Sequence, residues 1–303
     1  MDEIKEKNPE MKETANGGYS FVAALCLILA SLCFSIGGLL IKMIPWSALA
    51  INGARNLIGS CVIGIYLLCT RHRVVFNRTV LTGALSLIGV TALFTLANKM
   101  TTAANAIVLQ FTAPAFVILL MFILYGKKPA KIDIAACAAV FFGVCLFFVD
   151  GFRAGNQLGN LLAVISGICY AGVFMMNTGK GADAISSCFL GQLAAGVIFS
   201  PLMFRETDFS LQTLLPVLVL GVIQVGVSYI LLSYGIKKTP PAAACLITGM
   251  EPVLNPVWVA LFCGETLSPL SVIGGVIVVG SICAYNVLIA GRGKGEQAIG
   301  NRQ

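Results

Sequence analysis

Charged side chains are scarce in this sequence. Asp, Glu, Lys and Arg together make up 11% of the 303 residues, whereas hydrophobic residues make up 58%. An ordinary soluble domain carries roughly 45–50% apolar and about 25% charged residues. A soluble core has no use for so much apolar side chain, so the composition excludes an ordinary soluble protein.

Residues that commonly build catalytic and metal sites are also few. The single histidine, His72, lies between two arginines in a predicted loop, so it does not indicate a metal or nucleophile site. The eleven cysteines form no Cys-x-x-Cys pair and lie mostly in apolar runs, where cysteine is a small packing residue. A Walker phosphate loop is missing, which argues against a built-in ATP motor. We therefore expect no cofactor, no metal and no enzymatic activity.

Long apolar runs fill most of the chain. A helix that crosses a membrane needs about 20 apolar residues, because its backbone groups must pair within the segment. Glycine, proline and charge clusters divide the sequence into ten such runs, which predict an all-α polytopic membrane protein. The first run is too long for a signal-peptide core of roughly 7–15 residues, so it is expected to be retained. The predicted spans are residues 21–41, 48–69, 79–98, 103–125, 132–150, 158–177, 185–204, 212–236, 241–263 and 270–290.

The net charge of +7 is explained by the orientation of the chain in a membrane rather than by binding to a nucleic acid. No run of Lys and Arg exceeds three residues, so a nucleic-acid surface is not expected. With the N-terminus inside, fifteen of the twenty basic residues fall in inner segments and four in outer ones. Cytoplasmic loops are enriched in Lys and Arg. Both polar tails, residues 1–20 and 291–303, are therefore predicted to be cytoplasmic, in a bacterial inner membrane.

The two halves of the chain share one pattern. A shift of 138 residues aligns them without a gap over the central part of each half. The pattern predicts two five-helix repeats, residues 21–150 and 151–290, and the odd number of spans gives them opposite orientations. Such inverted repeats can rock about a shared central site, although a duplication that records ancestry alone is the alternative. The aligned pairs include Gly83 with Gly221, Lys99 with Lys237, Pro114 with Pro252, and Gly126 with Gly264.

Two charged residues fall near the middle of predicted spans. Arg55 lies in the second span and Glu251 in the ninth. A charge at the bilayer centre costs about 2.5–3.5 kcal/mol, so each side chain must face a partner or water. The structural alternative to a binding site is a buried ion pair, Arg55–Glu251 or another, that only joins helices.

Polar neighbours favour a substrate site around these two charges. The second span places Asn52, Arg55 and Asn56 on one helical stripe. The ninth span places Glu251, Asn255 and Trp258 at i, i+4 and i+7, which is also one face. Prolines near Glu251 leave backbone carbonyls without their helical donors.

Weaker candidates lie in other spans, and for each one alone an interhelical hydrogen bond is the favoured explanation over a substrate contact. These weaker candidates are Gln110, Tyr170, Asn177, Gln192, Gln224, Tyr229 and Tyr234. Of these, Gln110, Tyr170, Asn177 and Tyr229 are predicted to bind substrate.

Two segments carry a resemblance to a known family. Residues 109–127, LQFTAPAFVILLMFILYGK, and 247–265, ITGMEPVLNPVWVALFCGE, look like the fourth helix of an EamA repeat in the drug/metabolite transporter superfamily. The stretch from Ala30 to Arg55 is similar to the opening helices of that repeat. One departure is Lys127, which stands where the family commonly has the acid seen at Glu265. The resemblance implies two inverted five-helix repeats, with spans 1–4 and 6–9 around a cavity and spans 5 and 10 behind it.

The resemblance and the buried charges together predict a secondary active transporter, or permease. It is expected to move a small polar metabolite, such as an amino acid, by alternating access around a midplane cavity. Arg55 would attract an anionic group, and Glu251 would bind an amine or a coupling proton. Three alternatives stay open: an exporter of organic cations or drugs, a non-transporting receptor or assembly subunit on the same fold, and an intramembrane enzyme. A counter-substrate and a homodimer also stay open.

Overall fold

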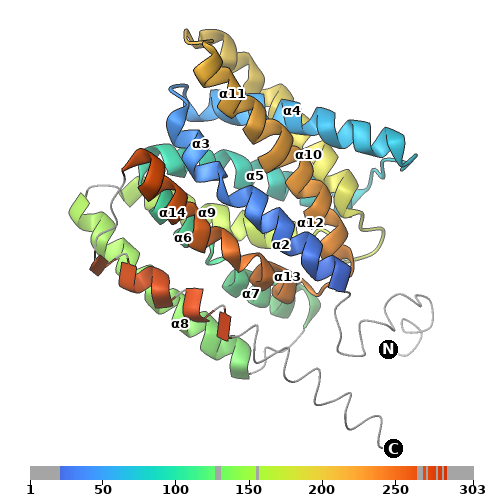
Figure 1. The fold of residues 1–303 in the computed structure, drawn as a ribbon. Coiled ribbons are helices and arrows are strands. Elements are labelled where there is room, and N and C mark those ends of the chain that lie inside the picture. The colour runs from blue at the N-terminus through green and yellow to red at the C-terminus, as the bar shows by residue number, and fades with distance from the viewer. Residues whose placement is uncertain are drawn as a thin grey trace, which may run out of the picture.

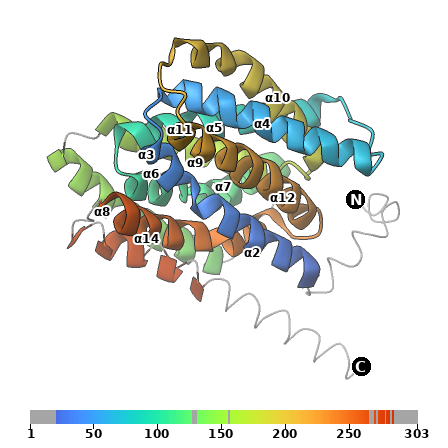
Figure 2. The same cartoon turned by 45° about the horizontal axis from the view of Figure 1, so that its top comes forward.

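The protein is a bundle of helices, seen from two directions in Figures 1 and 2. Every regular element in the part that the structure describes is a helix. The computed structural model describes residues 21–126, 131–154 and 157–264, and then 269–270, 272–277, 279–281 and 283–284. The predicted tails, residues 1–20 and 291–303, lie outside these ranges, as does part of the tenth predicted span.

The described residues of the first half form seven helices. Two of its five predicted spans are built from consecutive shorter helices, because the chain turns once within each. The helices are α2 (Phe21–Ser35), α3 (Gly37–Met43), α4 (Ala48–Cys69), α5 (Arg78–Met100), α6 (Ala103–Gln110), α7 (Ala113–Tyr125) and α8 (Lys131–Ala154).

The second half repeats this order with more irregular helices. They are α9 (Gln157–Phe174), α10 (Ala184–Phe199), the 3₁₀ helix η1 (Ser200–Arg205), α11 (Leu211–Val219), the π-helix η2 (Leu220–Val227), α12 (Ser228–Lys237), α13 (Pro241–Ile247), the 3₁₀ turn η3 (Thr248–Met250) and α14 (Glu251–Cys263).

Eight helical segments are long and apolar enough to cross a membrane. They correspond to the predicted spans 1–4 and 6–9. Two shorter apolar helices, Ile134–Gly143 and Val272–Ser281, lie where the fifth and tenth spans were predicted. The described chain is therefore an all-helical membrane protein with eight candidate spans and two shorter apolar helices. Figures 1 and 2 both place α8 and the described residues between 269 and 284 together at one edge of the bundle.

The fourth and ninth spans, predicted over 103–125 and 241–263, are each interrupted within the span. In the fourth span α6 ends at Gln110 and α7 begins at Ala113, with a proline in its first turn. In the ninth span η3 separates α13 from α14, which also begins with a proline in its first turn. Proline has no N–H to continue the helix but fits the first turn of a new one, so each break lies just before a proline.

Glycine contacts hold the two halves together along α4 and α10. A Cβ added at Gly53 would lie 2.4 Å from the backbone carbon of Phe199. At the same interface, a Cβ at Gly196 would lie 2.8 Å from the Cα of Leu57. Small residues permit this approach of two backbones, as is common between membrane helices. Arg55 lies on α4 two residues after Gly53 and is buried in the bundle.

Candidate functional site

A small polar cavity lies between helices of both halves. Its volume is about 30 Å³, enough for a water molecule or two but well below the roughly 300 Å³ of small-molecule sites. A metabolite therefore requires the helices to move apart. The lining residues are Phe34, Arg55, Val90, Thr91, Phe94, Gln110, Tyr170, Gln224, Val225, Tyr229 and Glu251.

Arg55 is buried, with 2% of its surface exposed, and all of its hydrogen-bond acceptors are neutral. Its Nη2 donates to the Thr95 hydroxyl over 2.8 Å, to the Thr91 carbonyl over 3.0 Å and to Asn52 Oδ1 over 3.3 Å. Its Nη1 donates to Gln224 Oε1 over 3.3 Å, and its Nε has no partner. The guanidinium is thus hydrogen-bonded, but among the described residues no carboxylate neutralises it.

Glu251 lines the same cavity from the first residue of α14. It is 4% exposed, and its Oε2 accepts a hydrogen bond of 3.3 Å from the Tyr170 hydroxyl. A carboxylate is favoured at a helix N-terminus, where the backbone N–H groups point outward. Arg55 and Glu251 are both in the described part of the chain and do not form an ion pair within 4.0 Å there. The interpretation of a simple Arg55–Glu251 bridge therefore does not describe this structure.

Aromatic rings form a second, apolar side of the cavity. Phe34 on α2 packs edge-on against Tyr229 on α12, with ring centroids 5.0 Å apart. Tyr170 contacts Phe111 with centroids 6.0 Å apart and Phe174 with centroids 4.8 Å apart. The Tyr170 ring is thereby fixed in position, so its hydroxyl is directed at Glu251.

Each break in a helix is covered by a helix of the other half. On α2, the Ser31 hydroxyl donates to the Thr248 carbonyl in η3 over 2.8 Å. On α9, a Cβ at Gly167 would lie 2.7 Å from the Gln110 carbonyl oxygen. The Gln110 side chain also reaches α9, where its Nε2 donates to the Ser166 hydroxyl over 3.2 Å. The two breaks are therefore held inside protein, as irregular backbone at membrane depth requires.

A π-helix presents Gln224 to Arg55. The segment η2 is followed by Ser228, whose hydroxyl donates to the Ile223 carbonyl over 2.7 Å. π-helical turns are rare and are frequent at functional sites. The sequence identified Gln224 as a weaker candidate, because it is a polar residue within a span, but it was not among the residues predicted to bind substrate. The cavity residues Phe34, Val90, Thr91, Phe94 and Val225 were likewise not predicted, because apolar and small residues within a span carry no signal.

Five predicted site residues line the cavity: Arg55, Gln110, Tyr170, Tyr229 and Glu251. Asn52 and Asn56 lie behind them. Asn52 accepts from Arg55, and Asn56 Nδ2 donates to the Asn52 carbonyl over 2.7 Å.

The other three predicted residues do not line this cavity. Asn255 is fully buried against α3, where a Cβ at Gly38 would lie 2.3 Å from its Oδ1. Trp258 donates from Nε1 to the Ser35 hydroxyl over 3.2 Å. Asn177 lies beyond the end of α9, where its Nδ2 donates to the Lys237 carbonyl over 3.4 Å.

Comparison with known families gives two matches within the chain. The sequence profile of the EamA-like transporter family matches residues 21–149 and 157–287. A solved crystal structure superimposes on 88% of this chain and 98% of its own, with a TM-score of 0.68 at 18% identity. That likeness shows a shared fold.

Similarity to curated proteins is more distant. An uncharacterized transporter of Archaeoglobus fulgidus is 26% identical over 190 residues, which cover 61% of this chain and 68% of that protein. The threonine/homoserine exporter RhtA of Escherichia coli K12 is 25% identical over 202 residues, 65% of this chain and 67% of the exporter. RhtA of Salmonella typhimurium is 25% identical over 193 residues, which is 62% of this chain and 64% of the exporter, less than two thirds of its length.

Proposed function

The chain belongs to the EamA-like transporter family, and we propose that it exports an amino acid or a closely related zwitterion by alternating access. Membership confirms the resemblance carried by the two fourth-helix segments, and it identifies a multi-span integral membrane transporter rather than an enzyme. The observation that carries the proposal is a pair of opposite charges, Arg55 and Glu251, that line one cavity without pairing.

A zwitterionic substrate would supply the missing partners of both charges. Its carboxylate would bind the Arg55 guanidinium, whose Nε is unpaired, because arginine binds carboxylates through two parallel hydrogen bonds. Its ammonium group would bind Glu251 beside the Tyr170 hydroxyl. The relatives named threonine/homoserine exporters carry amino acids with these same two groups, and their names support export as the direction.

The transport cycle in this proposal uses two inverted halves, residues 21–150 and 151–290, with both termini in the cytoplasm. Equivalent contacts on opposite faces support the inversion. Ser47 and Asp183 are the N-cap residues of α4 and α10, and they lie 136 residues apart, as do the starts of the two family matches. The Ser47 hydroxyl donates to Glu206 Oε1 over 2.6 Å, and Asp183 Oδ2 lies 2.9 Å from His72 Nε2.

Loops from both halves thus meet at each end of α4, and opening either side would break one set of contacts. Reporter fusions at the C-terminus test the orientation. A fluorescent protein that matures in the cytoplasm is expected to be active there, and activity only of a periplasmic reporter would contradict the proposal.

Glu251 is also the proposed carrier of a coupling proton, because it is the one carboxylate among the cavity-lining residues that the structure describes. A counter-substrate would replace the proton if flux proved insensitive to a pH gradient. Neither role requires a homodimer, since the lining residues come from one chain. We propose the bacterial cytoplasmic membrane as its location.

A second substrate class is favoured by one observation. Glu251 lies beside Tyr170, and Tyr229 and Phe34 line the same cavity. A carboxylate with aromatic neighbours can also bind an organic cation. Such a substrate has no anionic group for Arg55.

Counterflow in proteoliposomes separates these functions. Purified protein preloaded with unlabelled compound would be offered labelled neutral amino acids, amino acid esters and quaternary ammonium compounds. The proposal expects exchange of amino acids and none of their esters, because esterification removes the carboxylate that Arg55 binds. Exchange of esters and ammonium compounds, without free amino acids, would support the organic-cation exporter instead.

A further inference from the structure

A second cavity opens on the surface of the bundle, away from the central site. It has a volume of about 350 Å³ and lies between the start of α5, the end of α7 and the end of α9. It shares no lining residue with the central cavity. The lining residues of this groove are Arg78, Thr79, Thr82, Gly83, Leu120, Leu124, Tyr125, Gly172, Met175, Met176, Thr178 and Gly179.

The rim of the groove is basic and rich in hydroxyl groups. Arg78 is exposed, and within the described ranges its side chain has neither a hydrogen bond nor an ion pair. The Tyr125 hydroxyl donates to the Thr178 hydroxyl over 3.1 Å, and the Thr79 hydroxyl donates to the Lys180 carbonyl over 3.1 Å. None of the lining residues is acidic. The rim therefore offers a free cation and fixed polar groups to an anion.

The walls below the rim are apolar. Leu124 is 64% exposed on α7, and Leu120 lies one helical turn before it. Met175 and Met176 face the groove from the end of α9. Gly172, which lies at the floor of the groove, contributes no side chain. It packs so closely on α5 that an added Cβ would be 2.3 Å from the Ser86 hydroxyl oxygen. An apolar chain could lie along these walls while a charged group stays at the rim.

We propose that this groove binds an anionic phospholipid. Its phosphate would contact Arg78 and the neighbouring hydroxyls, and part of an acyl chain would lie against Leu120, Leu124 and Met175. Basic pockets between membrane helices on the positive side bind anionic lipid headgroups. The groove lies between helices of three candidate membrane spans, beside the predicted inner loop that holds Arg71 and Arg73. A lipid has both the negative group and the apolar chain that these two parts of the groove require.

A third cavity provides a contrast within the same protein. It has a volume of about 300 Å³, and its lining offers no polar surface. It lies between α4, η1 and α11, at the other end of α4. An acyl chain could enter it, but nothing there would select a headgroup. Selectivity for anionic lipid is therefore assigned to the groove around Arg78. The lining residues of the third cavity are Trp46, Ala54, Leu57, Ile58, Met203, Leu214, Val217 and Leu218.

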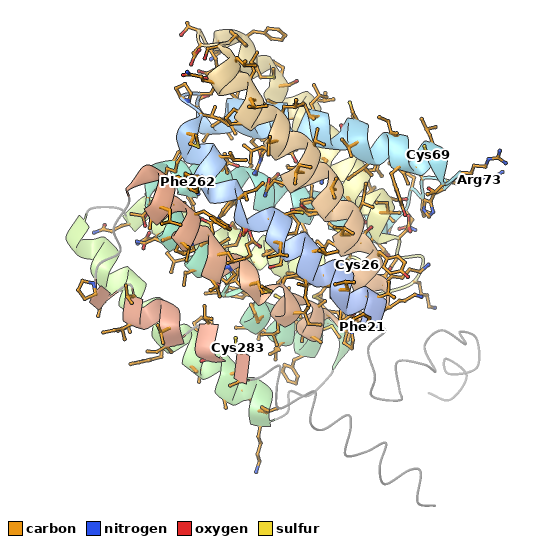
Figure 3. The ribbon with its side chains drawn as sticks, in the orientation of Figure 1. Phe21, Cys26, Cys69, Arg73, Phe262 and Cys283 are labelled. Carbon is orange, nitrogen blue, oxygen red and sulfur yellow. The ribbon has the colours of Figure 1, made fainter. Side chains whose placement is uncertain are left out.

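Native mass spectrometry of the full-length protein in detergent tests this inference without requiring transport. Phosphatidylglycerol and phosphatidylcholine with identical acyl chains would be titrated separately. We expect phosphatidylglycerol to bind about tenfold more tightly, which is the usual effect of one charged hydrogen bond. The variant Arg78→Gln should remove this preference. Its matched control is Arg73→Gln, because Figure 3 shows Arg73 projecting from the loop after α4, away from the bundle.

A second variant tests whether the lipid occupies the space inside the groove. Thr82→Trp would fill the space beside Thr79 without altering Arg78, and it should weaken phosphatidylglycerol binding at least as much. Leu85→Trp is its control, because Leu85 is 68% exposed on the same helix and does not line the groove.

Three results would overturn the proposal. One is equal affinity for the two lipids in the wild-type protein. Another is wild-type phosphatidylglycerol binding by both Arg78→Gln and Thr82→Trp. The third is displacement of the lipid by free glycerol phosphate at similar concentration, which would indicate a soluble phosphorylated ligand instead.

Discussion

The Ser31 hydroxyl on α2 donates a 2.8 Å hydrogen bond to the Thr248 carbonyl, the group that Pro252 leaves without a helical donor. Its counterpart in the other half is Gly167, which packs on the Gln110 carbonyl ahead of Pro114. Ser31 and Gly167 each lie ten residues after the start of their family match. In both halves, therefore, the carbonyl that a proline leaves without a donor is covered by the first helix of the opposite half. One half uses a hydroxyl group and the other uses close packing.

Replacing Ser31 by Ala should destabilise the protein, because it leaves the Thr248 carbonyl buried without a donor. The expected cost is about 1–3 kcal/mol, measured as a lower melting temperature in detergent. Ser60→Ala is the control, since the Ser60 hydroxyl donates to Leu57 within its own helix. Equal decreases in melting temperature for the two variants would show that the Ser31–Thr248 contact contributes no more to stability than a hydrogen bond within one helix.

Arg55→Gln should abolish amino acid binding while leaving the melting temperature unchanged or raised. Arg55 is a buried charge without a counter-ion, so removing it relieves a desolvation cost. This gain offsets the loss of the hydrogen bonds to Thr95, Thr91 and Gln224. Binding is measured by ligand-induced thermal shift, with Arg71→Gln as a control outside the cavity. A large loss of stability with intact binding would assign Arg55 a structural role.

Glu251→Gln should remove the charge and keep a hydrogen-bond acceptor for Tyr170. We expect it to reduce counterflow by at least about tenfold, as loss of a charged hydrogen bond does, and to make flux insensitive to a pH gradient. Asp208→Asn makes the equivalent change from acid to amide on the outer loop, away from the cavity, and should retain both properties. Wild-type flux and wild-type pH response in Glu251→Gln would exclude this residue from the mechanism.

Gly53→Ala should separate α4 from α10, because the new Cβ would lie 2.4 Å from the Phe199 backbone. Overpacking of this kind costs about 1–3 kcal/mol. Gly64→Ala on the same helix is the matched control, since the only near atom is in the Phe189 ring, 3.3 Å away. The melting temperatures of the two variants are compared. A decrease in Gly64→Ala as large as that in Gly53→Ala would contradict the prediction.

Asp208 should make the outer loop more stable at neutral than at acidic pH. Its carboxylate accepts from the Thr213 hydroxyl over 2.6 Å and from the Ser210 N–H over 2.9 Å, and these bonds hold its pKa below the ordinary value. A lowered pKa means that the stabilisation is complete above the unfolded pKa, about 3.9, and is lost as pH falls through the folded pKa. The difference in melting temperature between wild type and Asp208→Asn should therefore shrink on acidification. A difference that stays constant down to acid pH would contradict this role.

The amino-acid sequence alone was sufficient for the membrane class, the position of eight spans and the family. A bilayer accepts only segments that pair their own backbone groups, so the length and composition of each run carry this information directly. Pro114 and Pro252 also marked the places where carbonyls lose their donors. The family resemblance depended on the segments around these prolines, which the profile match then confirmed.

The tertiary structure alone decided which polar residues meet. Glu251, Asn255 and Trp258 share one helical face, yet only Glu251 lines the cavity, while Asn255 packs on Gly38 and Trp258 bonds to Ser35. Helical periodicity defines a face but not the neighbour that covers it. In a membrane, lipid and protein interior are equally apolar, so hydrophobicity does not distinguish them. The neighbours were set instead by close contacts of glycines and by the breaks before prolines, and these become visible only when both helices of a pair are in place.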